Sequence, residues 1–239
     1  MKLFLTGLLL FSATATIHAN IITNGDFSNG LAGWTVANAG TGLGGEAQVL
    51  TGLGDVTPAN SGQFLLLDTG PASIFGSATP TYATLTSNFT LASSQTVTLT
   101  FRYWGFSALF TGPGTSPVDT FQVQILPAAG PAIDALSFDT TDSSFAFIAN
   151  GPVNSPSGAS FFDSTPGANF NQSFTLAAGA YSLSFRVANG DSSLFDSGLL
   201  IENVSLTGSG GTQIPEPGTV TMMAIGVLGA LAVRRKLIH

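Results

Sequence analysis

The sequence predicts an all-β fold, a β-sandwich flanked by an N-terminal signal helix and a C-terminal transmembrane helix. Three observations support this. The 239 residues are 44% hydrophobic with 19 Phe, which is enough apolar material for a core. The 29 Gly and the many Ser and Thr residues favour strands joined by tight turns. Short stretches alternate between apolar and polar residues, and none shows sustained helical periodicity.

The first element is an apolar segment over residues 1–19. Lys2 supplies a positive start, Leu3–Phe11 is apolar, and Ser12–Ala19 is rich in small residues. This order is that of a secretory signal peptide, which the secretion machinery removes. We expect cleavage close to Ala19 and an exported mature protein.

The second element is the β domain, expected over residues 20–207. Its clearest strand is Gln95–Phe106, in which Val97 and Leu99 share one face while Arg102 and Trp104 share the other. Turn clusters that contain Gly and Pro separate the strands. The other predicted strands are Gln63–Asp68, Thr120–Leu126, Tyr181–Val187 and Leu199–Leu206.

An internal repeat lies inside this domain. Residues 89–102 read FTLASSQTVTLTFR, and residues 174–186 read FTLAAGAYSLSFR. The simplest interpretation is two similar hairpins, one in each half of a sandwich. The repeats place Arg102 and Arg186 at equivalent positions, and we expect each Arg to pair with an acid because acids are abundant around them.

Both ends of the domain carry short motifs. Asn24-Gly25-Asp26-Phe27 is followed by Gly33-Trp34, and residues 201–206 read IENVSL. This pattern resembles galactose-binding-like jelly rolls and related carbohydrate-binding modules. The resemblance implies a jelly-roll fold and a structural calcium held by Asp26 and Glu202. Ser28 stands where the family has an acid, which puts that calcium in doubt.

The C-terminal element is a three-part tail after a linker at 208–214. Pro215-Glu216-Pro217 opens the segment 215–239, residues 219–233 form an apolar stretch, and Arg234 and Arg235 follow. A helix of that stretch is roughly 22 Å long, short for a bilayer core of about 30 Å. The basic end is expected to stay cytoplasmic.

This tail resembles the PEP-CTERM sorting signal of Gram-negative bacteria that make extracellular polysaccharide. The resemblance implies that the chain is held briefly in the inner membrane, that an exosortase cleaves it near the Pro-Glu-Pro motif, and that the product reaches the cell surface or the extracellular space. The alternative is a plain tail anchor with a chance Pro-Glu-Pro.

Charge and residue usage exclude several functions. The segment between the two ends carries two Arg and twelve acids, a net charge of −10, which argues against nucleic-acid binding. The only histidines are His18 and His239, and Cys is absent. Triad catalysis and His-based zinc sites are therefore not expected in the mature domain. We predict no enzyme; a carboxylate-dependent glycosidase is the second alternative.

Polysaccharide binding is the function that the sequence favours, with a purely structural or adhesive surface domain as its first alternative. Sugar rings stack on aromatic faces and use polar partners at their edges. The aromatic candidates are Trp34, Tyr82, Tyr103, Trp104, Phe106 and Tyr181. We expect Trp34 and Tyr103 in the core, and Trp104 with Arg102 as the ligand-binding residues.

Overall fold

The computed structural model describes residues 20–39, 46–59, 62–70, 82–108, 119–142, 148–190 and 196–209. Within these ranges the chain is all-β and contains no helix. The signal helix expected within residues 1–19 and the transmembrane helix expected over 219–233 lie outside the described residues. A long apolar helix of the kind that crosses a membrane does not occur in the described part of the chain.

Twelve strands run through the described part of the chain, and residues 20–210 form one compact unit. The strands are β1 (Thr35–Ala39), β2 (Glu46–Leu50), β3 (Phe64–Asp68), β4 (Tyr82–Leu91), β5 (Gln95–Ser107), β6 (Thr120–Pro127), β7 (Ile133–Asp139), β8 (Ile148–Asn154), β9 (Ser160–Ser164), β10 (Ala168–Leu176), β11 (Gly179–Ala188) and β12 (Ser197–Gly208).

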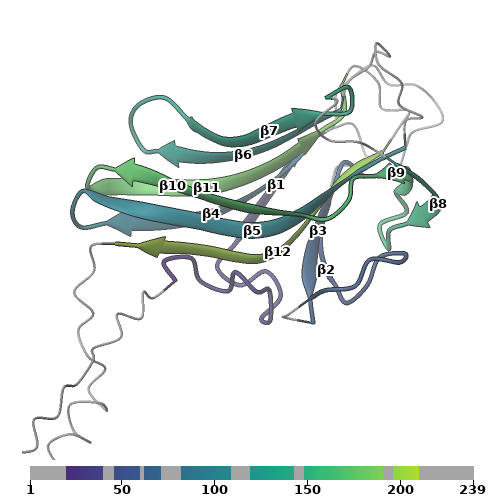
Figure 1. The fold of residues 1–239 in the computed structure, drawn as a ribbon, viewed down its shortest axis with the longest axis horizontal. Helices are drawn as coiled ribbons and strands as arrows, with labels where there is room; N and C mark the ends of the chain where they lie inside the picture. The colour runs from purple at the N-terminus through teal and green to yellow at the C-terminus, as the bar shows by residue number, and fades with distance from the viewer. Residues whose placement is uncertain are drawn as a thin grey trace, which may run out of the picture. The chain divides into compact units, whose positions relative to one another are not determined.

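These strands form two antiparallel sheets that face each other (Figure 1). One sheet has five strands in the order β1-β4-β11-β6-β7. The other has seven, in the order β2-β3-β12-β5-β9-β8, with β10 also pairing with β5. The core lies between them: the rings of Phe101 on β5 and Phe185 on β11 meet edge to face at 5.3 Å. The predicted β-sandwich is confirmed.

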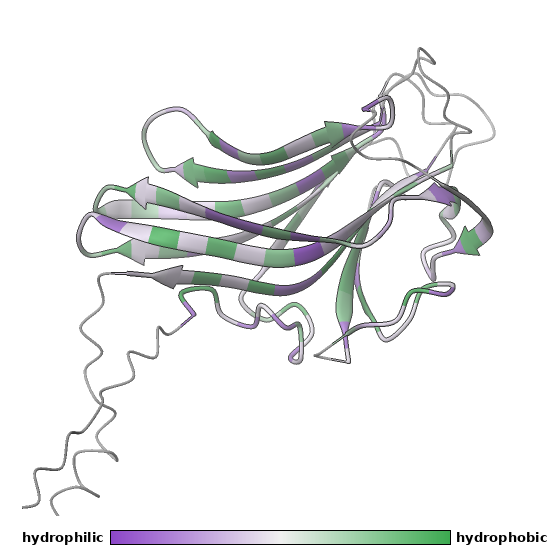
Figure 2. Cartoon of the chain, viewed as in Figure 1, coloured by the Kyte–Doolittle hydropathy of each residue, from purple (hydrophilic) through white to green (hydrophobic). Residues whose placement is uncertain are grey.

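Hydrophobic and hydrophilic residues alternate along several strands (Figure 2), and this alternation determines which side chains enter the core. On β5, Val97, Leu99, Phe101 and Tyr103 point inward and are at most 5% exposed. Successive strand residues point to opposite faces, so the intervening residues lie on the outer face. The five predicted strands correspond to β3, β5, β6, β11 and β12 within three residues at each end.

The prediction that the two repeats form hairpins is wrong. Each repeat is instead an arch whose two strands belong to different sheets: β4 pairs with β11, and β5 pairs with β10. The turns at residues 92–94 and 177–178 therefore carry the chain from one sheet to the other. The reason is that the two strands of each arch lie in opposite sheets and face each other across the core, where both bury their apolar faces.

The two arches pair with each other in the same register. Phe174 pairs with Val97 in the seven-stranded sheet, and the equivalent Phe89 pairs with Tyr181 in the five-stranded sheet. The repeat thus produces a local pseudo-two-fold arrangement, in which Arg102 and Arg186 occupy equivalent places on the outer faces of opposite sheets.

Candidate functional site

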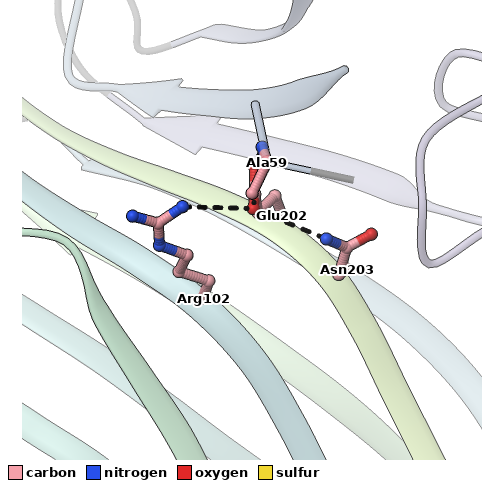
Figure 3. Close-up of polar contacts among 4 residues, drawn as sticks. All are labelled: Ala59, Arg102, Glu202 and Asn203. Carbon is pink, nitrogen blue, oxygen red and sulfur yellow. Dashed lines mark hydrogen bonds and ion pairs between the residues drawn. The ribbon is translucent and has the colours of Figure 1, made fainter. Parts of the chain in front are cut away.

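Arg102 and Glu202 lie side by side on the outer face of the seven-stranded sheet. They are partners in the β5–β12 register, and Arg102 Nη1 is 3.7 Å from Glu202 Oε1 (Figure 3). The Glu202 side chain is fully buried, while that of Arg102 is 34% exposed. The backbone N–H of Ala59 donates to both carboxylate oxygens, at 3.3 and 3.1 Å. The expected pairing of Arg102 with an acid is confirmed, and the pair ties a connecting segment to the sheet.

The indole of Trp104 lies on the same outer face, as its phase predicts, but it is covered. Trp104 is 5% exposed and belongs to a second apolar cluster with Leu53, Phe106 and Phe161. The Arg102 guanidinium lies 4.4 Å from the centre of its ring. Because protein atoms occupy its surroundings, Trp104 has no open face on which a sugar ring could stack. The burial of Trp104 therefore does not support its predicted role as a ligand-binding residue.

The two residues expected at a calcium site have other partners. Asp26 is exposed and accepts from the backbone and the hydroxyl of Ser28, at 3.2 and 3.0 Å. The Glu202 carboxylate is bound by Arg102 and Ala59. The described residues contain no cluster of three or more His, Cys, Asp or Glu suited to a metal. Calcium binding stays a prediction.

The opening motif is held by its own polar groups. The Asn24 amide donates to the carbonyls of Gly30 and Ala32, at 2.8 and 3.0 Å, and its oxygen accepts from Asn29 N–H at 2.9 Å. The Trp34 indole donates to the Asn24 carbonyl at 3.1 Å. Trp34 is 8% exposed, so its expected place in the core is confirmed.

The outer face of the five-stranded sheet has a different character. Arg186 lies between Thr84 on β4 and Gln122 on β6. Its guanidinium is 5.0 Å from the centre of the Tyr82 ring, and its Nη1 donates to Gln122 Oε1 at 3.3 Å. Arg186 forms no ion pair with another described residue, so the expectation that it pairs with an acid is wrong within that part of the chain.

Farther along the same face lies an open depression of about 330 Å³. Asn88 and Thr90 of β4, Ser182 and Ala180 of β11 and Leu126 of β6 contribute to its lining. The Ser182 hydroxyl donates to Asn88 Oδ1 at 2.6 Å. The depression and Arg186 lie on the same three strands, so together they form one surface. We call the outer face of β4, β11 and β6 the polar face.

Asp68 and Asp119 are two of the other buried acids in the described residues, and both lie next to strand ends. Asp68 ends β3 and accepts from Gly70 N–H at 2.9 Å and from the Ser157 hydroxyl at 2.8 Å. Asp119 accepts from the Ser107 hydroxyl at 2.9 Å. Burial raises the pKa of both carboxyls, and these hydrogen bonds partly oppose the rise. Each carboxyl links a strand end to a neighbouring segment, which is a structural role.

Of the two predicted ligand-binding residues, Trp104 is buried and Arg102 is paired with Glu202, and their contact with a ligand stays a prediction. Tyr82 was among the aromatic candidates, and it is the one that is not buried. Arg186 was expected, like Arg102, to pair with an acid. The two Arg differ in their register partners, which are Glu202 for Arg102 and Gln122 for Arg186. No sequence motif around Gln122 indicates that it lies beside Arg186.

Comparisons with known proteins add one sequence match and several distant structures. Residues 213–236 match the family model described as the PEP-CTERM protein-sorting motif. No curated protein matches the chain. Solved structures that are similar at low identity include the following three, and the first of them is far longer than the region it shares with this chain.

That first structure is the enzymatically active domain of tailspike protein 4 of bacteriophage CBA120, with 14% identity, a TM-score of 0.44, and coverage of 79% of this chain but 21% of the tailspike domain. TmCBM61, solved with β-1,4-galactotriose, has 12% identity, a TM-score of 0.40, and coverage of 80% and 99%. The K3 cleaved adhesin domain of Lys-gingipain from Porphyromonas gingivalis has 18% identity, a TM-score of 0.44, and coverage of 78% and 98%.

The sorting motif lies outside the described residues and includes Pro215, Glu216, Pro217, Arg234 and Arg235, as the sequence predicts. The chain is thus a β-sandwich that carries a PEP-CTERM protein-sorting motif at residues 213–236.

Proposed function

We propose that this protein is exported, sorted through its PEP-CTERM motif, and acts at the cell surface or in the extracellular matrix as a non-catalytic polysaccharide-binding domain. The motif at residues 213–236 supports the sorting. In this proposal residues 1–19 direct export, residues 219–233 hold the chain in the inner membrane, and an exosortase cleaves near Pro215-Glu216-Pro217.

The polar face carries the binding part of the proposal. Most of its outward residues on the three strands are hydroxyl and amide side chains, with the Tyr82 ring and the Arg186 guanidinium at one end and a depression that also has apolar lining residues, such as Leu126 and Ala180, at the other. Hydroxyl and amide groups both donate and accept hydrogen bonds, which suits the hydroxyl groups of sugars. Sheet strands hold such groups in fixed rows, so a glycan chain meets a preorganised surface.

Glycan-array binding of the full-length chain, purified in detergent, tests this function. We expect wild type to retain polysaccharide fragments. A double variant of two outward residues of β4, Tyr82→Ala with Thr86→Ala, is expected to bind about thirtyfold more weakly, because each lost contact contributes about 1 kcal/mol. Thr98→Ala is the matched control: Thr98 is on the outer face of the opposite sheet, where it hydrogen-bonds Ser173 at 2.9 Å.

If wild type retains no glycan, polysaccharide binding fails and the structural or adhesive coat function takes its place. If Thr98→Ala weakens binding as much as the double variant does, the site is not the polar face.

Mass spectrometry of the protein released from cells tests the sorting. We expect a C-terminus close to Pro215-Glu216-Pro217 and no peptides from residues 219–239. In cells without the exosortase, the chain is expected in the membrane fraction with its tail intact. An intact tail on the released protein would contradict the proposal.

A further inference from the structure

Arg102 and Arg186 occupy equivalent positions in the two repeats, but the residues beside them on the neighbouring strands differ. β12 places Glu202 beside Arg102, whereas β6 places Gln122 at the equivalent position beside Arg186. Glu and Gln have nearly the same shape and differ in charge. The guanidinium of Arg102 is therefore neutralised within the fold, and that of Arg186 has no carboxylate partner among the described residues.

Arg186 is also held in place. The Tyr82 ring lies against its guanidinium, and Gln122 Oε1 accepts from its Nη1. Because the Gln122 oxygen is used in this way, its amide nitrogen remains a donor, and the Thr84 hydroxyl lies on the other side of Arg186 in the register. A fixed guanidinium among neutral donors is the arrangement that binds a carboxylate well.

Among the described residues, the acids of the same sheet are too distant to pair with Arg186. Asp134 and Asp139 on β7 are the acids of the same sheet nearest in register, and β7 is two strands from β11. Two strand spacings are about 10 Å, which exceeds the Debye length of about 8 Å at physiological ionic strength. Asp134 in addition accepts from Gln124 at 2.6 Å.

The net charge of the domain limits how acidic the ligand is. Twelve acids against two Arg in residues 20–211 repel a polymer with a carboxylate on every sugar. A single carboxylate in a mostly neutral chain meets Arg186 locally and avoids most of this repulsion.

We infer that the polar face takes a mainly neutral polysaccharide that carries isolated carboxylates, as uronic acids do, and that Arg186 binds the carboxylate. This inference rests on the proposed function and names the class of glycan for the same surface. Gln122 is the specificity-determining neighbour, since a carboxylate at its position would occupy the guanidinium.

Matched pairs of oligosaccharides test the inference: each pair consists of a neutral oligosaccharide and the same oligosaccharide with one glucuronic acid. Binding of the full-length chain in detergent is measured at physiological ionic strength. We expect wild type to prefer the glucuronic-acid member by about tenfold or more, the effect of one charge-assisted hydrogen-bonded pair. Arg186→Gln and Gln122→Glu are both expected to bring the ratio of the two affinities close to one, whereas Thr98→Ala is expected to keep the wild-type ratio.

Equal affinity of wild type for both members overturns the inference and leaves the proposed function standing, as does a preference that survives in Gln122→Glu. Absence of binding to every pair overturns both. Thermal unfolding of each variant shows that it is folded. Gln122→Glu is expected to be at least as stable as wild type, because it recreates the pair that Glu202 forms with Arg102.

Discussion

Gly25 is a position in the described part of the chain where a single added methyl group has a large consequence. In the opening motif, its backbone lies directly against the last strand, and the Val204 N–H donates to the Gly25 carbonyl at 2.8 Å. A Cβ at residue 25 would lie 1.8 Å from the Val204 carbonyl oxygen, which is far inside the 3.4 Å at which ordinary contact begins. The neighbour is backbone, so no side-chain rotation relieves the clash.

The cost of Gly25→Ala follows from this geometry. Separating the two backbones by more than 1 Å breaks the Val204–Gly25 hydrogen bond, worth about 1 kcal/mol, and disturbs the packing of the buried Phe27. Overpacking of a core typically adds about 1–3 kcal/mol. We expect a total near 3 kcal/mol, which lowers the unfolding midpoint by about 6–12 °C for a domain of this size.

Urea and thermal unfolding, followed by circular dichroism, measure this loss. Gly52→Ala is the matched control, because the nearest atom to its Cβ is 3.9 Å away and its φ is not positive. The control is expected within about 0.5 kcal/mol of wild type. If Gly25→Ala also unfolds within that margin, the close approach does not constrain the fold and the reasoning is wrong.

Three further changes test polar contacts. Asn24→Ala removes three loop hydrogen bonds and should cost about 2–3 kcal/mol in urea unfolding; an unchanged midpoint would contradict this. Glu202→Gln keeps an acceptor and should cost about 1 kcal/mol or less, since Arg102 is 34% exposed, whereas Glu202→Ala should cost about 2–3 kcal/mol; equal losses would refute the distinction. Burial raises the pKa of Asp68 above 3.8, so its contribution to stability is complete below pH 3.8 and is lost as the pH rises through its folded pKa. As the pH rises through the folded pKa of Asp68, the urea unfolding midpoint of Asp68→Asn minus that of wild type should therefore increase. A difference between the two midpoints that does not change with pH would exclude the effect.

Much of the fold could be predicted from local pattern, and the missed strands show why the rest could not. β5 and β11 bury one complete face, so their alternation is visible in the sequence. β2 has no fully buried residue, and most of β10 is exposed or half-buried, so neither shows a clear period. The internal repeat is also visible in the sequence. A hairpin and an arch differ only in which strands pair, however, and the same repeated sequence is compatible with both.

The candidate site shows the same division. The alternation of β5 correctly placed Arg102 and Trp104 on an outer face. Trp104 is nevertheless buried there, in a cluster that includes Leu53 and Phe161 of β9, and a strand's own alternation does not show what packs against it. The sequence by itself determined the sorting motif, the sandwich class and the equivalence of Arg102 with Arg186. Only the tertiary structure decided which Arg is neutralised, because the deciding neighbours, Glu202 and Gln122, are remote in sequence and become adjacent through strand pairing.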